Sequence, residues 1–370
     1  MTAVQYPNQI LSQIPKYLQA SLEDISTNLE LGCELCIRHP NYQPWETSID
    51  MKSRFQKLPW EVQQKHIAKH LRNFLYGVYY NGSLIKSLEL QTNTAELVDN
   101  QKLNNDNLIG IDVSLFQQLH ASNQGEGYFS PEWVVKKQEK DGTIAVNRGQ
   151  LTVHINPEIH LKTSEKSVAI GDIVAVKMPK NCVQEGFYIA VGNTGVVPVD
   201  EEDKNYRIVR IYFNITSDGA VPLMQALTQQ LNEQKIYFSF KVPYSYSSYD
   251  RYDAGVLYIR QNDYLNIYQI LQNIYNENQA YFQENIPLFT KYLAPGLGLA
   301  EEPDTKFEQQ ESFGTNRCQI VANGLLIAQQ NNRRSPEEKL STIIEQFAKL
   351  NVDLRYPYLN PNSTDIYTPL

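Results

Sequence analysis

The sequence predicts an α+β protein in which a helical N-terminal region, residues 1–120, precedes a domain, residues 125–370, with helices packed on a mixed or antiparallel sheet. In the first region, apolar residues recur every three or four positions, which is the spacing of one helix face. In the second region, short runs of β-branched and aromatic residues are bounded by Gly, Pro, Asn or Asp. Strands are then followed by helices, and this order favours an α+β fold over a βαβ nucleotide-binding fold.

Two helices are expected in the N-terminal region. The apolar face of the first helix comprises Ile10, Ile14, Leu18, Leu22 and Ile25. The second helix follows Pro59, a residue typical of helix starts, and its apolar face extends from Trp60 to Val78. The polar segment 91–107 is expected to be a loop, because Asn, Asp and Thr are frequent in it.

Six strands and four helices are expected after residue 125. The strands are 151–161, 171–179, 186–192, 207–215, 235–243 and 254–260. The helices are 221–234, 263–286, 312–330 and 335–350. The last helix should begin with a capping box, because Ser335 stands three residues before Glu338.

The composition limits the class of function. The chain carries a net charge of −8, so nonspecific binding to nucleic acid or to an anionic membrane is not expected, and any anion site must be local. Its four cysteines form no regular framework, which fits a reducing compartment. The first residues contain no basic segment followed by an apolar core. We therefore expect a cytoplasmic protein.

Cysteine and histidine motifs give only weak signals. Cys33 and Cys36 form a lone CxxC close to His39, without the second pair that a zinc finger needs, and we expect them on a helix with a buried face. His66 and His70 have a metal-compatible spacing, but no carboxylate accompanies them, so a solvated helix face is the expectation.

Single titratable residues near turns are also weak candidates. His154 and His160 lie in a strand and turn, where either could be a general acid, but a surface or structural role is more usual. Lys177 and Lys180 stand at a strand end, where lysines usually extend into water, although a phosphate-facing role remains open.

Polar residues alternate with apolar ones in the later strands, and this pattern gives the strongest signal for a site. Period-two alternation places alternate residues on one face of a strand. The residues concerned are Arg210, Tyr212 and Asn214 in one strand, Lys241 beside Ser239 in the next, and Tyr258 with Arg260 in the third. A solvent-facing polar surface is the alternative for any one strand. Cations or phenols on three strands of an acidic protein indicate an anion site.

A helix start supplies a fourth segment of this candidate site. Ser312 and Gly314 precede a helix that holds Arg317 near its first turn. The N–H groups of a helix N-terminus suit a phosphate, and an arginine adds a bidentate donor. An ordinary Ser N-cap with an exposed arginine is the alternative.

The order of these segments resembles the type III effector HopA family. The similarity covers about residues 125–370 and is carried by RIYFNIT, FKVP, YDRYDAGVLYIR, PLFTKYLAPGLGLAEEP and FGTNRC. That family also includes stand-alone proteins and the lyase component of some lanthipeptide gene clusters. The resemblance implies a carbon–oxygen lyase that eliminates phosphate from phosphoserine or phosphothreonine in a peptide and leaves a dehydroamino acid.

The pattern is also distantly similar to the OspF-type phosphothreonine lyases. This similarity implies that Lys241 is the catalytic base and that Tyr212 stands where those enzymes have a catalytic histidine. It assigns phosphate binding to a larger set, namely Arg210, Arg251, Tyr258, Arg260 and Arg317, and we add Asn214 from the strand pattern. The tyrosine-rich segment 244–253 would be a lid over the bound peptide.

The expected chemistry needs neither a metal nor an organic cofactor. Burial and nearby arginines should lower the pKa of Lys241 so that it can remove the α-proton. The expected partners are a phosphorylated peptide or protein and a kinase-like protein. Two alternatives stay open: a non-catalytic phosphopeptide- or partner-binding module, favoured by the tyrosine at position 212, and a scaffold whose N-terminal helices recruit a kinase or a leader peptide.

Overall fold

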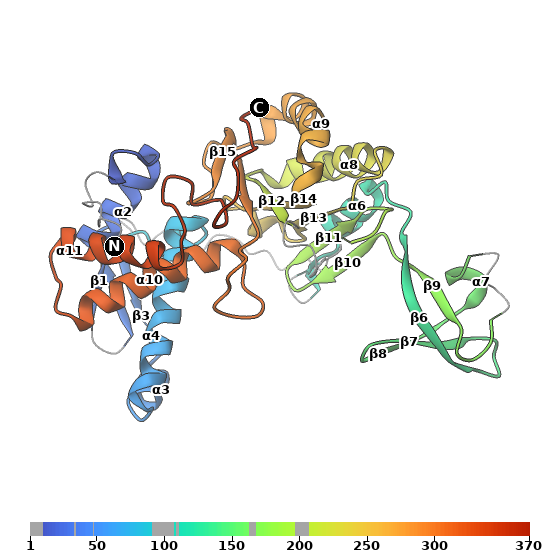
Figure 1. Ribbon diagram of the computed structural model, residues 1–370, viewed down its shortest axis with the longest axis horizontal. Coiled ribbons are helices and arrows are strands. Elements are labelled where there is room, and N and C mark those ends of the chain that lie inside the picture. Colours follow the sequence, from blue (N-terminus) through green and yellow to red (C-terminus); the bar gives the residue numbers. More distant parts are fainter. Residues whose placement is uncertain are drawn as a thin grey trace.

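The computed structural model describes residues 10–32, 35–46, 48–90, 107–108, 111–162, 168–196 and 207–370. It confirms the α+β class, with helices and antiparallel sheets arranged in three parts (Figure 1). These parts are a central sheet with helices, a helical part that joins the two ends of the chain, and a smaller projecting sheet. Within these described ranges, no helix is long and apolar enough to cross a membrane.

The central sheet has seven strands, and each neighbouring pair is antiparallel. In spatial order the strands are β10 (Asn181–Gln184), β11 (Phe187–Val191), β13 (Phe238–Pro243), β14 (Gly255–Arg260), β12 (Ile208–Phe213), β16 (Leu297–Glu301) and β15 (Lys291–Ala294). Period-two alternation is clear in β12, where Val209, Ile211 and Phe213 are all buried on one face. Three helices lie near this apolar face in Figure 1, namely α6 (Val113–Ser122), α8 (Ser217–Glu233) and α9 (Tyr264–Glu277).

The helical part contains segments from both halves of the chain. Its main helices are α2 (Lys16–Asn28), α4 (Trp60–Leu75), α10 (Phe313–Gln330) and α11 (Pro336–Lys349). Helix α10 packs against α4 and α11, and α11 packs against α2, so early and late helices share one core (Figure 1). The predicted capping box at Ser335 is confirmed: its hydroxyl accepts from the Glu338 N–H, and the Glu338 carboxylate accepts from the Ser335 N–H.

The N-terminal region also contains shorter elements. They are the three-stranded sheet β1 (Glu30–Leu31), β2 (Cys36–His39) and β3 (Tyr42–Glu46), the helices α3 (Ile49–Phe55) and α5 (Ile85–Leu88), the π-helix η1 (Tyr76–Tyr80), and the strand pair β4 (Asn107–Leu108) and β5 (Ile111–Asp112). The expected helix at the CxxC motif is wrong, because Cys36 lies in β2 and Cys33 is outside the described residues. Most of the expected loop 91–107 is also outside them.

A four-stranded sheet projects from the rest of the molecule in Figure 1. Its elements are β6 (Tyr128–Gln138), β7 (Ile144–Arg148), β8 (Leu151–Ile155), β9 (Ile173–Met178) and the short helix α7 (Pro157–His160). It has a separate hydrophobic core, which includes Trp133 and Val135. The strand expected to reach residue 161 ends earlier, because the Asn156 side chain caps α7 and Pro157 occupies its first position.

Short 3₁₀ turns complete the fold. They are η3 (Tyr246–Ser248), η4 (Gln261–Asp263) and η5 (Gln279–Tyr281). The helix expected over 263–286 ends at Glu277, after which Asn278 hydrogen-bonds back to the Ile274 carbonyl and the chain turns through η5. Helix α8 starts at Ser217, four residues before its expected start at residue 221.

Candidate active site

The register of the central sheet places the predicted strand residues on one face. Lys241 pairs with Val256, and Val256 pairs with Tyr212, so these three form one row across β13, β14 and β12. Tyr258 pairs with Arg210 on one side and with Ser239 on the other, which makes the adjacent row. Residues opposite each other in antiparallel strands have neighbouring side chains. The sheet therefore gathers a lysine, an arginine and two tyrosines on the face away from α8 and α9.

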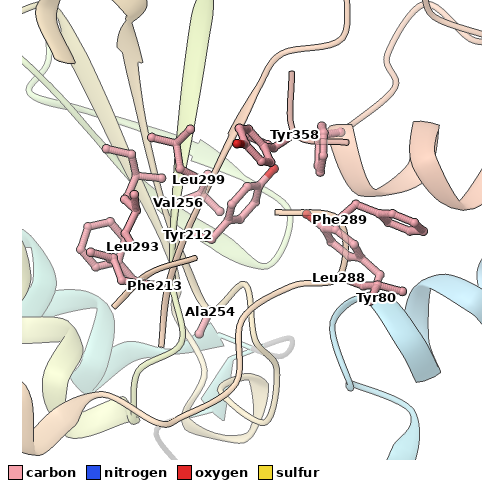
Figure 2. Close-up of a cluster of buried hydrophobic side chains, with 14 of the residues drawn as sticks. Tyr80, Tyr212, Phe213, Ala254, Val256, Leu288, Phe289, Leu293, Leu299 and Tyr358 are labelled. Carbon is pink, nitrogen blue, oxygen red and sulfur yellow. The ribbon is translucent and has the colours of Figure 1, made fainter. Parts of the chain in front are cut away.

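This polar face is not an ordinary solvent-facing surface. Tyr212 is only 2% exposed, and the Arg210 side chain is only 12% exposed. Figure 2 shows Tyr212 in a cluster of buried side chains that includes Tyr80 and Phe289. The Tyr212 ring also lies near Phe313 of α10, with 6.4 Å between centroids. Segments from the helical part thus cover this end of the sheet.

The Lys241 amine occupies a partly buried position beside an aromatic ring. Its Nζ lies 3.8 Å from the centroid of the Phe187 ring on β11, a cation–π contact. Among the residues that the structure describes, the amine makes no hydrogen bond or ion pair. Burial, together with the charges of Arg251 and Arg210, lowers the pKa of Lys241 to about 8, and Asp253 opposes the shift. A lysine in this position has a substantial neutral fraction near physiological pH.

Arg251 lies in the loop between β13 and β14 and is held by a nearby carboxylate. Asp253 accepts from Nε of Arg251 at 2.5 Å and from Nη2 at 2.9 Å, a bidentate pair. Arg251 also approaches the Phe187 ring, with 5.7 Å from Cζ to the centroid. Lys241 and Arg251 therefore share one aromatic neighbour. Within the described ranges, Nη1 of Arg251 has no hydrogen-bond partner and can meet an anion.

Arg210 on β12 is also held by a carboxylate, as Arg251 is. Its Nε donates to Glu302, just after β16, and its guanidinium lies over the Tyr258 ring at 5.1 Å. Glu302 takes only Nε, and in the described parts of the chain the terminal nitrogens have no hydrogen bond. Burial raises the pKa of Tyr258, and Arg210 only partly offsets this, so the Tyr258 phenol is protonated at neutral pH. Tyr258 remains partly accessible.

Tyr212 is more deeply buried than a group in direct contact with substrate needs to be. Its hydroxyl interacts with Tyr80 and otherwise has no hydrogen-bond partner across the described residues, and the two rings meet edge-on with 6.4 Å between their centroids. Burial raises the pKa of Tyr212 above its ordinary value despite the charge of Arg210. The phenol is therefore protonated, but at 2% exposure it lies beneath the accessible surface.

Three predicted phosphate ligands either lie away from Lys241 or bind other groups of the protein. They are Asn214, Arg260 and Arg317. Asn214 is fully buried and donates to the Asn285 carbonyl at 2.8 Å. Arg260 forms a bidentate pair with Asp263 and lies over the Tyr237 ring, in the row of the sheet beyond Tyr258.

Arg317 is the third of these residues, and it is buried in the helical part. It is 2% exposed, and burial lowers its pKa to about 10. Its guanidinium donates to the carbonyls of Pro357 and Leu359 and to the Asn316 side chain. The expected Ser312 cap is present, because the Ser312 hydroxyl accepts from the Thr315 N–H. Arg317 thus fixes the C-terminal segment to α10.

The candidate active site is therefore smaller than the predicted set and includes residues that the sequence did not single out. It comprises Lys241, Arg210, Arg251, Tyr258 and, beneath them, Tyr212. The missed residues are Phe187, Asp253 and Glu302, together with Tyr76 and Asn81 from the N-terminal region, whose side chains donate hydrogen bonds to Asp253. Asp253 follows Arg251 by two positions, and this proximity was a usable signal. The other four are distant in sequence and gave none.

The remaining motifs lie elsewhere. No group of three or more His, Cys, Asp or Glu side chains within the described ranges could hold a metal ion. His66 is exposed on α4, as expected, whereas His70 accepts from the Trp45 indole at 3.1 Å. His154 is exposed on β8, and His160 is half-buried at the end of α7. Lys177 is exposed, and Lys180 donates to the Asn123 carbonyl.

Comparisons with known proteins place this site in context. Residues 178–359 match the model of the HopA1 effector protein family, and this range includes Lys241, Arg210, Arg251, Tyr258 and Tyr212 but not Tyr76 and Asn81 of the N-terminal region. No curated protein matches the chain.

Two solved structures are similar to the chain. One is an effector protein from Pseudomonas syringae pv. tomato strain DC3000, with 18% identity, a TM-score of 0.37, and coverage of 48% of this chain and 63% of that one. The other is an effector protein from Pseudomonas syringae pv. syringae strain 61, with 16% identity, a TM-score of 0.41, and coverage of 84% and 97%.

Proposed function

Residues 178–359 relate this chain to the HopA1 effector protein family, and from that premise we propose that it is a carbon–oxygen lyase that eliminates phosphate from phosphoserine or phosphothreonine in a peptide. The observation that carries the proposal is the position of the Lys241 amine. It is partly buried, is influenced by the charges of Arg251 and Arg210, and has no hydrogen bond or ion pair among the described residues. An amine in such a place loses its proton more readily and is a competent base.

In the proposed reaction, the neutral Lys241 amine removes the α-proton of the phosphorylated residue. The electron pair left on the α-carbon is delocalised onto the adjacent carbonyl, and the Arg210 guanidinium stabilises the negative oxygen. That pair then forms the carbon–carbon double bond as the bond between the β-carbon and the phosphate oxygen breaks. Phosphate leaves on Arg251, whose Nη1 makes no hydrogen bond within the described ranges.

The departing oxygen takes a proton from a phenol. The sequence assigns this role to Tyr212, but Tyr212 lies beneath the accessible surface. Tyr258 on the neighbouring strand is protonated, partly accessible and in contact with Arg210. We therefore assign proton donation to Tyr258 and a packing role beneath Arg210 to Tyr212. Solvent then returns the proton from the Lys241 ammonium to the Tyr258 phenolate, which restores both groups.

The substrate in this proposal is a phosphorylated peptide, so a kinase-like protein must act before it, and both would meet in the cytoplasm. The tyrosine-rich segment 244–253 carries Arg251 and would close over the peptide. The alternative is a phosphopeptide-binding module without catalysis. The tyrosine at position 212, in place of a histidine, favours that alternative, which would use the same arginines.

Mass spectrometry of a phosphothreonine peptide separates the two functions. The peptide is incubated with the protein at pH 7–9, and its binding is measured in parallel by fluorescence anisotropy. Elimination removes the mass of phosphoric acid and leaves a product that adds a thiol, as a dehydroamino acid does. Binding across the pH series without any loss of mass would establish the non-catalytic module instead.

A further inference from the structure

The loop that carries Arg251 is held by the N-terminal region. The backbone N–H of Tyr252 donates to the Asn81 carbonyl at 2.8 Å, and the Tyr252 ring packs on Gly82. Gly82 has a φ of +73°, and a Cβ there would lie 2.6 Å from Tyr252 Cζ. Only glycine accommodates both this φ and this close approach. A connection about 170 residues distant in sequence thus fixes the backbone beside Arg251.

The same segment also holds the carboxylate that orients Arg251. Asp253 is 6% exposed and accepts from the Tyr76 hydroxyl at 3.0 Å and from the Asn81 amide at 3.1 Å, in addition to its pair with Arg251. Its oxygens therefore accept hydrogen bonds both from Arg251 in its own loop and from Tyr76 and Asn81 in the N-terminal region. Although burial opposes ionisation, these partners keep the pKa of Asp253 below its ordinary value.

A π-helical turn brings these two donors together. In η1 the N–H of Asn81 donates to the Tyr76 carbonyl five residues earlier, at 3.0 Å, so Asn81 follows Tyr76 by one wide turn. The Tyr76 and Tyr80 rings stack at 5.0 Å within the turn. Gly314 of α10 approaches the Tyr80 ring so closely that a Cβ there would lie 2.3 Å from it. The turn is therefore fixed on the side of α10 as well.

We infer that Tyr76 and Asn81 are positioning residues that hold the Asp253–Arg251 pair beside Lys241, which makes the N-terminal region part of the candidate active site. The inference rests on the proposed function, because it takes Lys241 to be the base of the proposed elimination. Neither residue touches the Lys241 amine, and both act through Asp253.

If the Arg251–Asp253 pair loses its hydrogen bonds to Tyr76 and Asn81 and moves away from Lys241, the pKa of Lys241 should change. The charged groups that face this amine are Arg251 and Asp253 from the loop and Arg210 from β12. Among these charges, Arg251 has the largest influence and favours the neutral amine, whereas Asp253 acts oppositely and more weakly. When both move away together, the influence of Arg251 is the greater loss. The pKa of Lys241 should then rise towards that of an ordinary lysine.

The test measures the reactivity of the Lys241 amine in the full-length chain. Trace acetylation with acetic anhydride over a pH series, quantified by peptide mass spectrometry, gives the midpoint at which the amine loses its proton. The variants are Tyr76→Phe, Asn81→Ala and their double variant. Tyr79→Phe is the matched control, because it removes a tyrosine hydrogen bond to a carboxylate in the same turn, but that carboxylate is Asp24.

The inference predicts a wild-type midpoint of about 8, an upward shift in both single variants, and the largest shift in the double variant. Tyr79→Phe should keep the wild-type midpoint. Unshifted midpoints in the folded Tyr76→Phe and double variants, or an equal shift in the control, would overturn it. Tyr76→Phe keeps the ring, so it remains informative if Asn81→Ala fails to fold. The labelling needs no turnover, so a wild type without lyase activity would refute the proposed function and leave this test intact.

Discussion

The Lys241 amine lies 3.8 Å from the centroid of the Phe187 ring and, among the described residues, is not paired with any carboxylate. The contrast with the two arginines that influence this amine is informative, because Arg210 and Arg251 each pair with a carboxylate. A cation–π contact stabilises an ammonium by about 0.5–2 kcal/mol, less than a buried carboxylate can. Lys241 is thus a cation that the fold leaves free to lose its proton.

The first prediction concerns the pH dependence of the proposed elimination. The reactive form is the neutral amine, and the pKa of Lys241 is lowered to about 8 by burial and by Arg251 and Arg210. The rate should therefore rise about tenfold per pH unit below 8 and become level above it. Burial raises the pKa of Tyr258, so the acid should not be lost in this range. A rate that falls between pH 7 and 9 would contradict these roles.

The second prediction concerns stability. Between pH 8 and 10.5, an unfolded chain binds a proton at Lys241 that the folded chain does not, so stability should rise with pH across this window. Below pH 8, the folded state retains a poorly solvated ammonium. Lys241→Met should therefore raise the unfolding free energy at pH 7 by about 3 kcal/mol, because the difference between a pKa of about 8 and one of 10.5 corresponds to about 1.4 kcal/mol per pH unit, and the gain should vanish near pH 10.5.

A matched control exists for this substitution. Lys291 is also poorly exposed, but its amine pairs with Asp365 at 2.5 Å. Lys291→Met should lower the unfolding free energy at pH 7, because it leaves a carboxylate without its partner. Urea denaturation of both variants at pH 7 measures the difference. A loss of stability in both would show that Lys241 is an ordinary structural cation.

The third prediction separates the two phenols. Tyr258→Phe removes the assigned proton donor and should lower kcat by about 10²-fold or more, with little effect on peptide binding. Tyr212→Phe removes a buried hydroxyl that, apart from an interaction with Tyr80, has no hydrogen-bond partner within the described ranges, so its effect on kcat should be severalfold at most. A larger loss in Tyr212→Phe would return the acid role to that residue, where the sequence placed it.

The fourth prediction concerns the Arg251–Asp253 pair. Arg251→Ala leaves the buried Asp253 carboxylate with only neutral partners and should lower the unfolding free energy by about 3 kcal/mol. The double variant Arg251→Ala/Asp253→Asn should recover much of that loss, because no charge is then left unpaired. Both should bind inorganic phosphate more weakly in a ³¹P NMR titration. If phosphate binding is unchanged in the folded double variant, Arg251 is not a phosphate ligand.

Much of the fold could be predicted because it depends on local sequence patterns, namely apolar periodicity and capping residues. Alternation in β12 predicted its buried face, and Ser335 with Glu338 predicted a cap that the structure confirms. Errors occurred where local hydrogen bonds or a proline ended an element earlier than its apolar pattern predicted. Asn156 and Pro157 end β8 by starting α7, and the turn at Asn278 ends α9.

The candidate site was only partly predictable, for a different reason. A strand residue's face follows from period-two alternation, so Arg210, Lys241 and Tyr258 could be grouped. The alternation does not show how deeply a side chain is buried, so the burial of Tyr212 and Asn214 was not predicted. Arg317 was expected at a phosphate but lies against carbonyls of the chain's own C-terminal segment. Contacts such as Asn81 with Asp253 depend on tertiary packing across about 170 residues.

The most direct test is phosphate release from a phosphothreonine peptide by Lys241→Ala at pH 9, compared with the wild type. Released phosphate is measured over time, and peptide binding is measured on the same samples. The account predicts that the wild type releases phosphate, and that the variant still binds the peptide but releases phosphate at least about 10²-fold more slowly. Equal release by the two proteins, or none by the wild type, would contradict the proposal that this amine is a catalytic base.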